Sequence, residues 1–231
     1  MTIKELIVNT TKLAQKKFRL HPEGKSIIAN MLSWLLIANG ILFFLSISNT
    51  ILTIIYILSI AAFLSLIYYF RNPERKVIPD EKYIYAPVDG RITSVTEVVE
   101  PEYFKKKFVR VEISLSLTDI HVLRVPLSGK VKYCHFQLED YRIAWHQLLS
   151  HKESASVGLI SDTGTEIFLK QTGGAIVSYA NENNYINQGN DLGFIIWGSS
   201  VDLFIPLSAD IRVKAGERVV GNITILAKAT S

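Results

Sequence analysis

The chain has only one cysteine, Cys134, among its 231 residues. A single thiol excludes an internal disulfide framework and any zinc or iron–sulfur site held by several cysteines. We read Cys134 as a small hydrophobic residue of the core. A strong excess of one charge is also missing, because 25 Lys and Arg oppose 21 Asp and Glu, and 48% of the residues are hydrophobic. This composition excludes a disordered or nucleic-acid-coating polymer, and we expect no nucleic-acid partner.

Charged residues are absent from one long stretch. Residues 26–70, 45 consecutive positions, contain no Asp, Glu, Lys, Arg or His, whereas a bilayer crossing needs about 20 apolar residues. The polar, turn-compatible segment 46–50 divides the stretch into Ile27–Leu45 and Ile51–Phe70. We therefore predict a transmembrane helical hairpin over residues 26–70. A pair of buried core helices is the alternative. We do not expect a cleaved signal peptide, because the stretch begins too late and no small-residue cleavage pattern follows it.

Basic residues flank both ends of this hairpin. Those nearest to it are Lys12, Lys16, Lys17, Arg19 and Lys25 before the hairpin, and Arg71, Arg75 and Lys76 after it. Positive charge beside a membrane span favours the cytoplasmic side. We therefore place both chain ends, and the body that follows, on the cytoplasmic side of the cytoplasmic membrane. We predict that residues 1–25 form a basic interfacial segment. Within it, Ile3–Arg19 is either an amphipathic helix on the membrane surface or a solvated segment that precedes the hairpin.

Residues 71–231 change to short runs rich in β-branched and aromatic residues. These runs predict a mainly β domain, with strands at Tyr83–Val88, Arg91–Val99, Phe108–Leu117, Lys130–Gln137, Glu166–Gln171, Ala175–Tyr179, Phe194–Ile205 and Asn222–Ala227. Arg142–Leu149 is predicted as the one helix or ordered loop of the domain.

Two pairs of short segments within this domain have similar sequences. Val88–Ile92 is similar to Leu127–Val131, and Gly189–Ile195 is similar to Gly216–Ile223. Glycines at such turns permit a positive φ, and the β-branched residues beside them favour strands. We therefore predict a body built from two similar halves, like the barrel–sandwich hybrid fold of lipoyl and biotinyl domains.

Four segments carry residues suited to chemistry. They are Phe70–Arg75, Ala86–Gly90, Ser116–Pro126 and Phe194–Leu203. In their order and spacing these segments closely resemble the phosphatidylserine decarboxylases, specifically the short bacterial and archaeal type. The resemblance covers about two-thirds of the chain, from the end of the hairpin to the C-terminus.

This resemblance implies a proenzyme in which Ser199 cuts the Gly198–Ser199 peptide bond and becomes a pyruvoyl group, the cofactor. It also implies that the substrate is phosphatidylserine in the membrane, that the products are phosphatidylethanolamine and CO2, and that the two fragments of the chain stay partners. Decarboxylation of an amino acid leaves a carbanion that no side chain can delocalise. A pyruvoyl carbonyl supplies the missing electron sink through a Schiff base with the substrate amine.

The resemblance also assigns roles to Asp89 and His121. In the family, the Asp of the Asp-Gly segment and the His of the Asp-x-His segment support the attacking serine, and both positions match here. A neutral imidazole oriented by a carboxylate is a usual way to activate a hydroxyl. Without the resemblance, an Asp-Gly pair is most often a turn, and a single His is most often structural or solvated.

Two positions depart from the family pattern. Arg124 stands where longer relatives carry a second His, so His121 would serve both cleavage and later proton transfer. Ser200 adds a second hydroxyl beside the bond, although only Ser199 directly follows the Gly198 carbonyl.

Other interpretations stay open. We predict no metal site, because the remaining histidines lack the spacing of a zinc hydrolase. A non-enzymatic, membrane-anchored adaptor or carrier of the hybrid fold is the runner-up, and it would need a modifiable lysine at an exposed hairpin tip. A third interpretation keeps the enzyme but changes the lipid to ether-linked archaetidylserine, whose headgroup is identical. The residues also leave open whether the chain forms a homo-oligomer.

Overall fold

The computed structural model describes residues 18–45, 48–75, 77, 79–136, 154–173, 176–196 and 200–229. These residues form two compact units, one ending at Glu74 and the other beginning at Arg75. Three predicted features lie outside the described residues: most of the basic segment 1–25, the helix or loop at Arg142–Leu149, and the Gly198–Ser199 bond.

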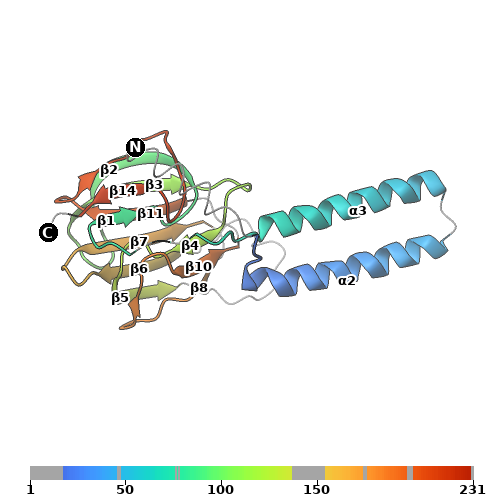
Figure 1. The fold of residues 1–231 in the computed structure, drawn as a ribbon, viewed down its shortest axis with the longest axis horizontal. Coiled ribbons are helices and arrows are strands. Elements are labelled where there is room, and N and C mark those ends of the chain that lie inside the picture. Colours follow the sequence, from blue (N-terminus) through green and yellow to red (C-terminus); the bar gives the residue numbers. More distant parts are fainter. Residues whose placement is uncertain are drawn as a thin grey trace. The chain divides into compact units, whose positions relative to one another are not determined.

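The first unit is a hairpin of two long helices, α2 (Pro22–Phe44) and α3 (Asn49–Tyr69) (Figure 1). Both helices are long and apolar enough to cross a membrane, and only 6% and 0% of their most apolar windows are buried. A core helix of a soluble protein would be mostly buried, so the alternative of two core helices does not fit. The predicted apolar helical hairpin is confirmed, and it is compatible with a membrane.

Helix α2 begins at Pro22, before the uncharged stretch starts. Proline suits the first turn because its missing N–H would have no helical acceptor there. The ring nitrogen Nδ1 of His21 accepts from the Glu23 amide at 3.4 Å and caps the same turn. These local signals extend the helix through Gly24 and Lys25.

Several hydroxyl side chains of the hairpin are hydrogen-bonded within it. The hydroxyls of Ser33, Thr53 and Ser65 donate to backbone carbonyls four residues earlier, at 3.0, 2.9 and 2.8 Å. Ser59 donates to the Asn39 Oδ1 atom across the two helices at 3.3 Å. Such internal bonding is what a helix surrounded by lipid requires, because hydrocarbon offers no partner to a polar group.

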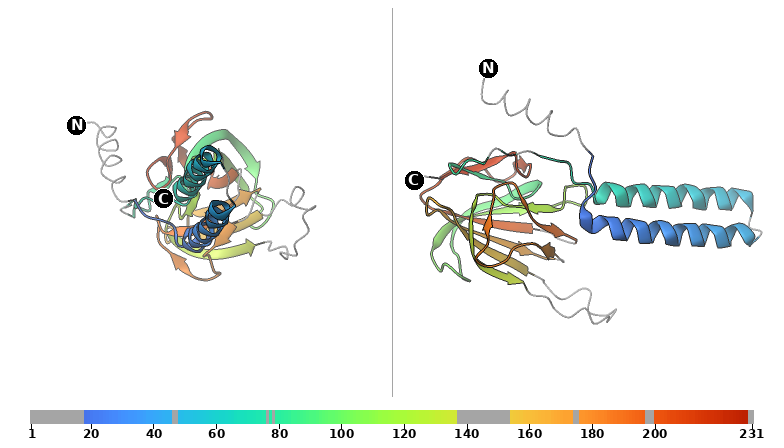
Figure 2. Two further views of the ribbon diagram at one scale, coloured as in Figure 1. Left: turned by 90° about the vertical axis from the view of Figure 1, so that its right-hand side faces the viewer. Right: turned by 60° about the horizontal axis from the view of Figure 1, so that its bottom comes forward.

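The described residues of the second unit form fourteen strands in three antiparallel sheets. The largest sheet has eight strands in the order β13-β2-β3-β11-β7-β6-β5-β9, and it curls around the core (Figure 2). Its strands are β13 (Arg218–Val219), β2 (Gly90–Val99), β3 (Lys107–Ser114), β11 (Ser200–Pro206), β7 (Glu166–Thr172), β6 (Ser154–Ile160), β5 (Gly129–Phe136) and β9 (Tyr185–Ile186).

Two three-stranded sheets complete the unit. One has the order β4-β10-β8, and the other has the order β1-β14-β12. Their strands are β4 (Val122–Arg124), β10 (Asp191–Ile195), β8 (Ile176–Ser178), β1 (Tyr83–Tyr85), β14 (Ile225–Lys228) and β12 (Asp210–Ile211). The prediction of a mainly β body is confirmed.

The eight-stranded sheet packs hydrophobic side chains on both faces. Along β11, Val201, Leu203 and Ile205 point into the main core, whereas Phe204 packs with Phe108 and Phe168 in an aromatic cluster on the opposite face. Cys134 is half-buried at the edge of the main core, and burial raises the pKa of its thiol to about 11. This agrees with its interpretation as a small hydrophobic residue.

The prediction of a single strand at Phe194–Ile205 was wrong. Phe194–Ile205 is not one strand, because β10 ends at Ile195 in a three-stranded sheet and β11 begins at Ser200 in the eight-stranded sheet. Continuous hydrophobicity marks a buried segment but does not reveal a change of sheet. The break falls at residues 196–199, which include the predicted cleavage bond.

Within each pair of similar segments, the corresponding glycines have the same kind of environment. Gly90 and Gly129 each begin a long strand, and a Cβ at either would lie against a carbonyl oxygen of the paired strand, Ser114 or Ile160. Gly189 and Gly216 have φ values of +86° and +89°. The expected positive φ therefore applies to the second pair, whereas close backbone approach explains the first.

Candidate active site

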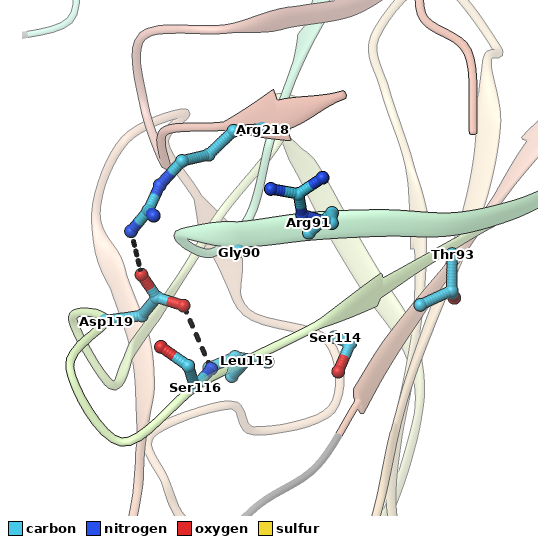
Figure 3. Close-up of a pocket in the computed structure, with 8 residues that line it drawn as sticks. All are labelled: Gly90, Arg91, Thr93, Ser114, Leu115, Ser116, Asp119 and Arg218. Atoms are coloured by element: carbon cyan, nitrogen blue, oxygen red, sulfur yellow. Dashed lines mark hydrogen bonds and ion pairs between the residues drawn. The ribbon is translucent and has the colours of Figure 1, made fainter. Parts of the chain in front are cut away.

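The segment that carries the predicted base is buried from Asp119 to Gly129. A tight turn introduces it, in which the Asp119 amide donates to the Ser116 carbonyl and the Asp119 carboxylate accepts from the Ser116 amide, both at 2.9 Å. The other Asp119 oxygen accepts from Arg218 Nη2 at 2.5 Å (Figure 3). The turn is thereby tied to β13, and it fixes the backbone just ahead of His121.

His121 is 2% exposed and directly precedes β4. Its backbone carbonyl accepts a hydrogen bond from the Ile195 amide at 2.8 Å. Ile195 is the last residue of β10, and β11 starts at Ser200. The predicted base is therefore bonded to the strand that leads into the predicted cleavage bond. The bond itself lies outside the described residues.

Asp89 has a different set of contacts from the one predicted. Its carboxylate accepts from both terminal nitrogens of Arg75, with Nη2 to Oδ2 at 2.8 Å, and from the Gly221 amide at 2.8 Å. The side chains of Arg75 and Asp89 are 4% and 13% exposed, so this is a buried ion pair. The described contacts of Asp89 do not include His121, and its role toward that residue stays a prediction.

Arg124 occupies the position of the missing second His. Its backbone amide donates to the Pro87 carbonyl at 2.8 Å, which joins β4 to the Ala86–Gly90 segment. Its guanidinium is buried, and Nη1 lies 3.8 Å from Asp191 Oδ1. Burial lowers the pKa of Arg124, while the charges of Asp191 and Asp89 oppose this shift. A guanidinium nevertheless stays protonated in proteins, so Arg124 cannot replace a histidine as a base.

The fold brings the predicted segments together, since backbone bonds join the Asp89 and His121 segments to each other and to β10. Sequence reasoning missed three charged residues that shape this region, namely Arg75, Asp119 and Arg218. Their sequence signals were indirect: Arg75 stood among the basic residues after the hairpin and in the Phe70–Arg75 segment, Asp119 in the Ser116–Pro126 segment, and Arg218 in the Gly216–Ile223 repeat. Among the residues that the structure describes, no three His, Cys, Asp or Glu side chains converge as a metal site requires.

Comparison with known proteins indicates one family. A profile of the phosphatidylserine decarboxylase family matches residues 63–227. The phosphatidylserine decarboxylase proenzyme of Amoebophilus asiaticus is 34% identical over 219 residues, which cover 92% of this chain and 97% of that protein. The proenzyme of Phocaeicola vulgatus is 35% identical over 221 residues, 92% of this chain and 96% of that protein. The proenzyme of Cytophaga hutchinsonii is 32% identical over 215 residues, 90% of this chain and 98% of that protein.

No solved structure matches the chain. The family match and the similarity over most of the chain define an enzyme of the carboxy-lyase class. The chain belongs to the phosphatidylserine decarboxylase family.

The buried Arg75–Asp89 pair yields a test of the fold around the site. Arg75→Gln leaves the Asp89 carboxylate buried without its counter-charge, so we expect a loss of about 3 kcal/mol in unfolding free energy. Arg212→Gln is a matched control, because its pair with Asp210 is solvent-exposed, with side chains 41% and 70% exposed, and should cost less than about 1 kcal/mol. Denaturant unfolding of the two variants measures both values. Equal losses would contradict the role of the buried pair.

Proposed function

We propose that this chain is a membrane-bound, pyruvoyl-dependent decarboxylase that converts phosphatidylserine to phosphatidylethanolamine and CO2. The observation that carries the proposal is the bond from the Ile195 amide to the His121 carbonyl, at 2.8 Å. It ties the candidate base to the strand that enters residues 196–199, where the chain passes between two sheets. The relatives named as proenzymes of this activity support the same conclusion.

Maturation in this proposal is a self-cleavage at Gly198–Ser199. The Ser199 hydroxyl attacks the Gly198 carbonyl and converts the peptide bond to an ester. Elimination then releases the Gly198 carboxylate, and water converts the remaining dehydroalanine to a pyruvoyl group with loss of ammonia. When formed, the pyruvoyl group supplies the electron sink that α-decarboxylation of an amino acid requires.

The fold explains how two fragments would stay together after the cut. The C-terminal fragment, residues 199–231, contains β11, which pairs with β3 on one side and with β7 on the other. It also supplies β13 to the eight-stranded sheet and the strands β12 and β14 to another sheet. Separating the fragments would expose the core residues of β11 to water, so they should remain one body.

His121 is the proton acceptor in this proposal. The imidazole is buried and comes from the segment bonded to β10, and a neutral imidazole can take the proton of an attacking hydroxyl. Asp89 is the acidic member of the unit. Its described hydrogen bonds go to Arg75 and Gly221 and use three of the roughly four acceptor sites of a carboxylate. A direct action on His121 would therefore use the remaining site on Oδ2.

The helical hairpin anchors the enzyme in the cytoplasmic membrane, with the β unit on the cytoplasmic side. The two exposed apolar helices support insertion, and the basic residues before and after them support this sidedness. A substrate held in a bilayer by its acyl chains can be reached only by an enzyme at the interface. The anchor therefore suits a lipid substrate better than a soluble one.

Two adjacent hydroxyls allow a matched test of the cleavage. Ser199→Ala removes the nucleophile and the carbon skeleton of the cofactor, so the chain should stay uncut and form no phosphatidylethanolamine. Ser200→Ala removes a hydroxyl that has no glycine carbonyl before it, and this variant should be cut and active. Gel electrophoresis and product analysis with phosphatidylserine in mixed micelles measure both. An uncut Ser200→Ala chain beside a cut Ser199→Ala chain would overturn the assignment.

A double-variant comparison tests whether Asp89 acts through His121. His121→Ala should block cleavage because the hydroxyl loses its proton acceptor, and Asp89→Ala should slow it. If the two residues act as a unit, the double variant cleaves hardly more slowly than His121→Ala. The rate of fragment appearance on gels is the measurement, and normal cleavage of His121→Ala would contradict the proposal. Additive losses would instead mean that Asp89 serves only to hold Arg75.

A further inference from the structure

A pocket of about 240 Å³ lies beside the turn that precedes His121. Figure 3 shows its lining, which comes from β2, the end of β3, the turn and β13. Two guanidinium groups and three hydroxyls are among the lining groups, which belong to Gly90, Arg91, Thr93, Ser114, Leu115, Ser116, Asp119 and Arg218. Neither the family match nor the sequence motifs give this pocket a role.

The strand register connects the pocket with the predicted cleavage bond. Arg218 is paired with Arg91, Arg91 with Ser114, and Ser114 with Ser200. Residues directly opposite each other in an antiparallel sheet point to the same face. These four side chains therefore form one row across β13, β2, β3 and β11. The row runs from the pocket to the residue that follows Ser199.

The charges in the pocket favour an anion. Arg218 is paired with Asp119, so these two charges offset each other. Arg91 is exposed, and its Nη1 donates to the Gly216 carbonyl at 3.1 Å. Among the described residues Arg91 has no carboxylate within ion-pair distance, which leaves the pocket with one excess positive charge. A guanidinium fork with neighbouring hydroxyls is well suited to phosphate oxygens.

We propose that this pocket binds the phosphodiester of the lipid headgroup and that Arg91 is its main contact. The inference rests on the proposed function, in which the serine headgroup reacts at the site formed by Ser199. In phosphatidylserine only the serine β-carbon and its oxygen separate the reacting α-carbon from the phosphorus. A phosphate site must therefore lie close to the reacting group. The pocket residue Ser114 is paired directly with Ser200, the residue that follows Ser199, and Arg91 is paired with Ser114 on the next strand.

An exposed apolar residue beside the pocket favours a lipid over free phosphate. Leu117 stands between the pocket residues Ser116 and Asp119 and is 72% exposed. Surface leucines rarely need an explanation when they are isolated, but an apolar side chain next to an anion site matches the two parts of a phospholipid at an interface. A site for free phosphate would gain no binding energy from the Leu117 side chain.

The test compares Arg91→Gln with Arg212→Gln, which removes an exposed guanidinium outside the pocket. In mixed micelles, the full-length Arg91→Gln enzyme should self-cleave to the wild-type extent but show a KM for phosphatidylserine raised by at least about tenfold, with kcat within about twofold. Arg91→Lys, which keeps the charge without the fork, should be intermediate. Arg212→Gln should match the wild type. An unchanged KM in Arg91→Gln would overturn the proposal.

A binding measurement separates this inference from the proposed function. Calorimetry with glycerophosphoserine, a soluble phosphodiester, should show binding to the full-length chain that Arg91→Gln weakens by at least about tenfold. Loss of this binding supports the pocket even if the chain never matures. Binding of inorganic phosphate that depends on Arg91, with no effect on glycerophosphoserine or on the KM, would instead identify a free-phosphate site and overturn the proposal.

Discussion

The bond between the Ile195 amide and the His121 carbonyl joins the two parts of the candidate site. It pairs the end of β10 with the start of β4, in a sheet that packs against the same core as the eight-stranded sheet. A few residues later the chain enters that larger sheet as β11, one of its two middle strands. The segment between Ile195 and Ser200 is thus held at both ends by backbone pairing. A self-cleaving bond needs such fixed ends, because its nucleophile and its base must meet in one geometry.

The buried charges near the bond between Ile195 and His121 are balanced. Arg75 and Arg124 are two buried cations, and Asp89 and Asp191 are the carboxylates that offset them. Unpaired charges would be costly in such a buried place. Arg124, in the position of a second histidine, is a permanent cation, so the mechanism that we propose assigns proton transfer to His121. The excess positive charge lies instead at the exposed pocket beside Arg91, where it can meet an anionic lipid.

Much of this arrangement could be predicted from local sequence. The hairpin followed from the uncharged stretch at residues 26–70, and most long strands followed from their β-branched residues. The break between β10 and β11 was missed because both strands are buried and their hydrophobicity is continuous. The Arg218–Asp119 contact joins residues 99 positions apart, and the row from Arg218 to Ser200 depends on strand register. Neither follows from any local pattern, since pairing across a sheet is set by tertiary packing.

The mass of the C-terminal fragment tests the central claim most directly. The full-length protein should yield two chains, and the chain beginning at residue 199 should be lighter than its encoded mass by one ammonia. That deficit identifies serine converted to a pyruvoyl group, whose carbonyl should also react with a hydrazine. A single uncut chain, or a fragment that keeps an intact N-terminal serine, would contradict the account.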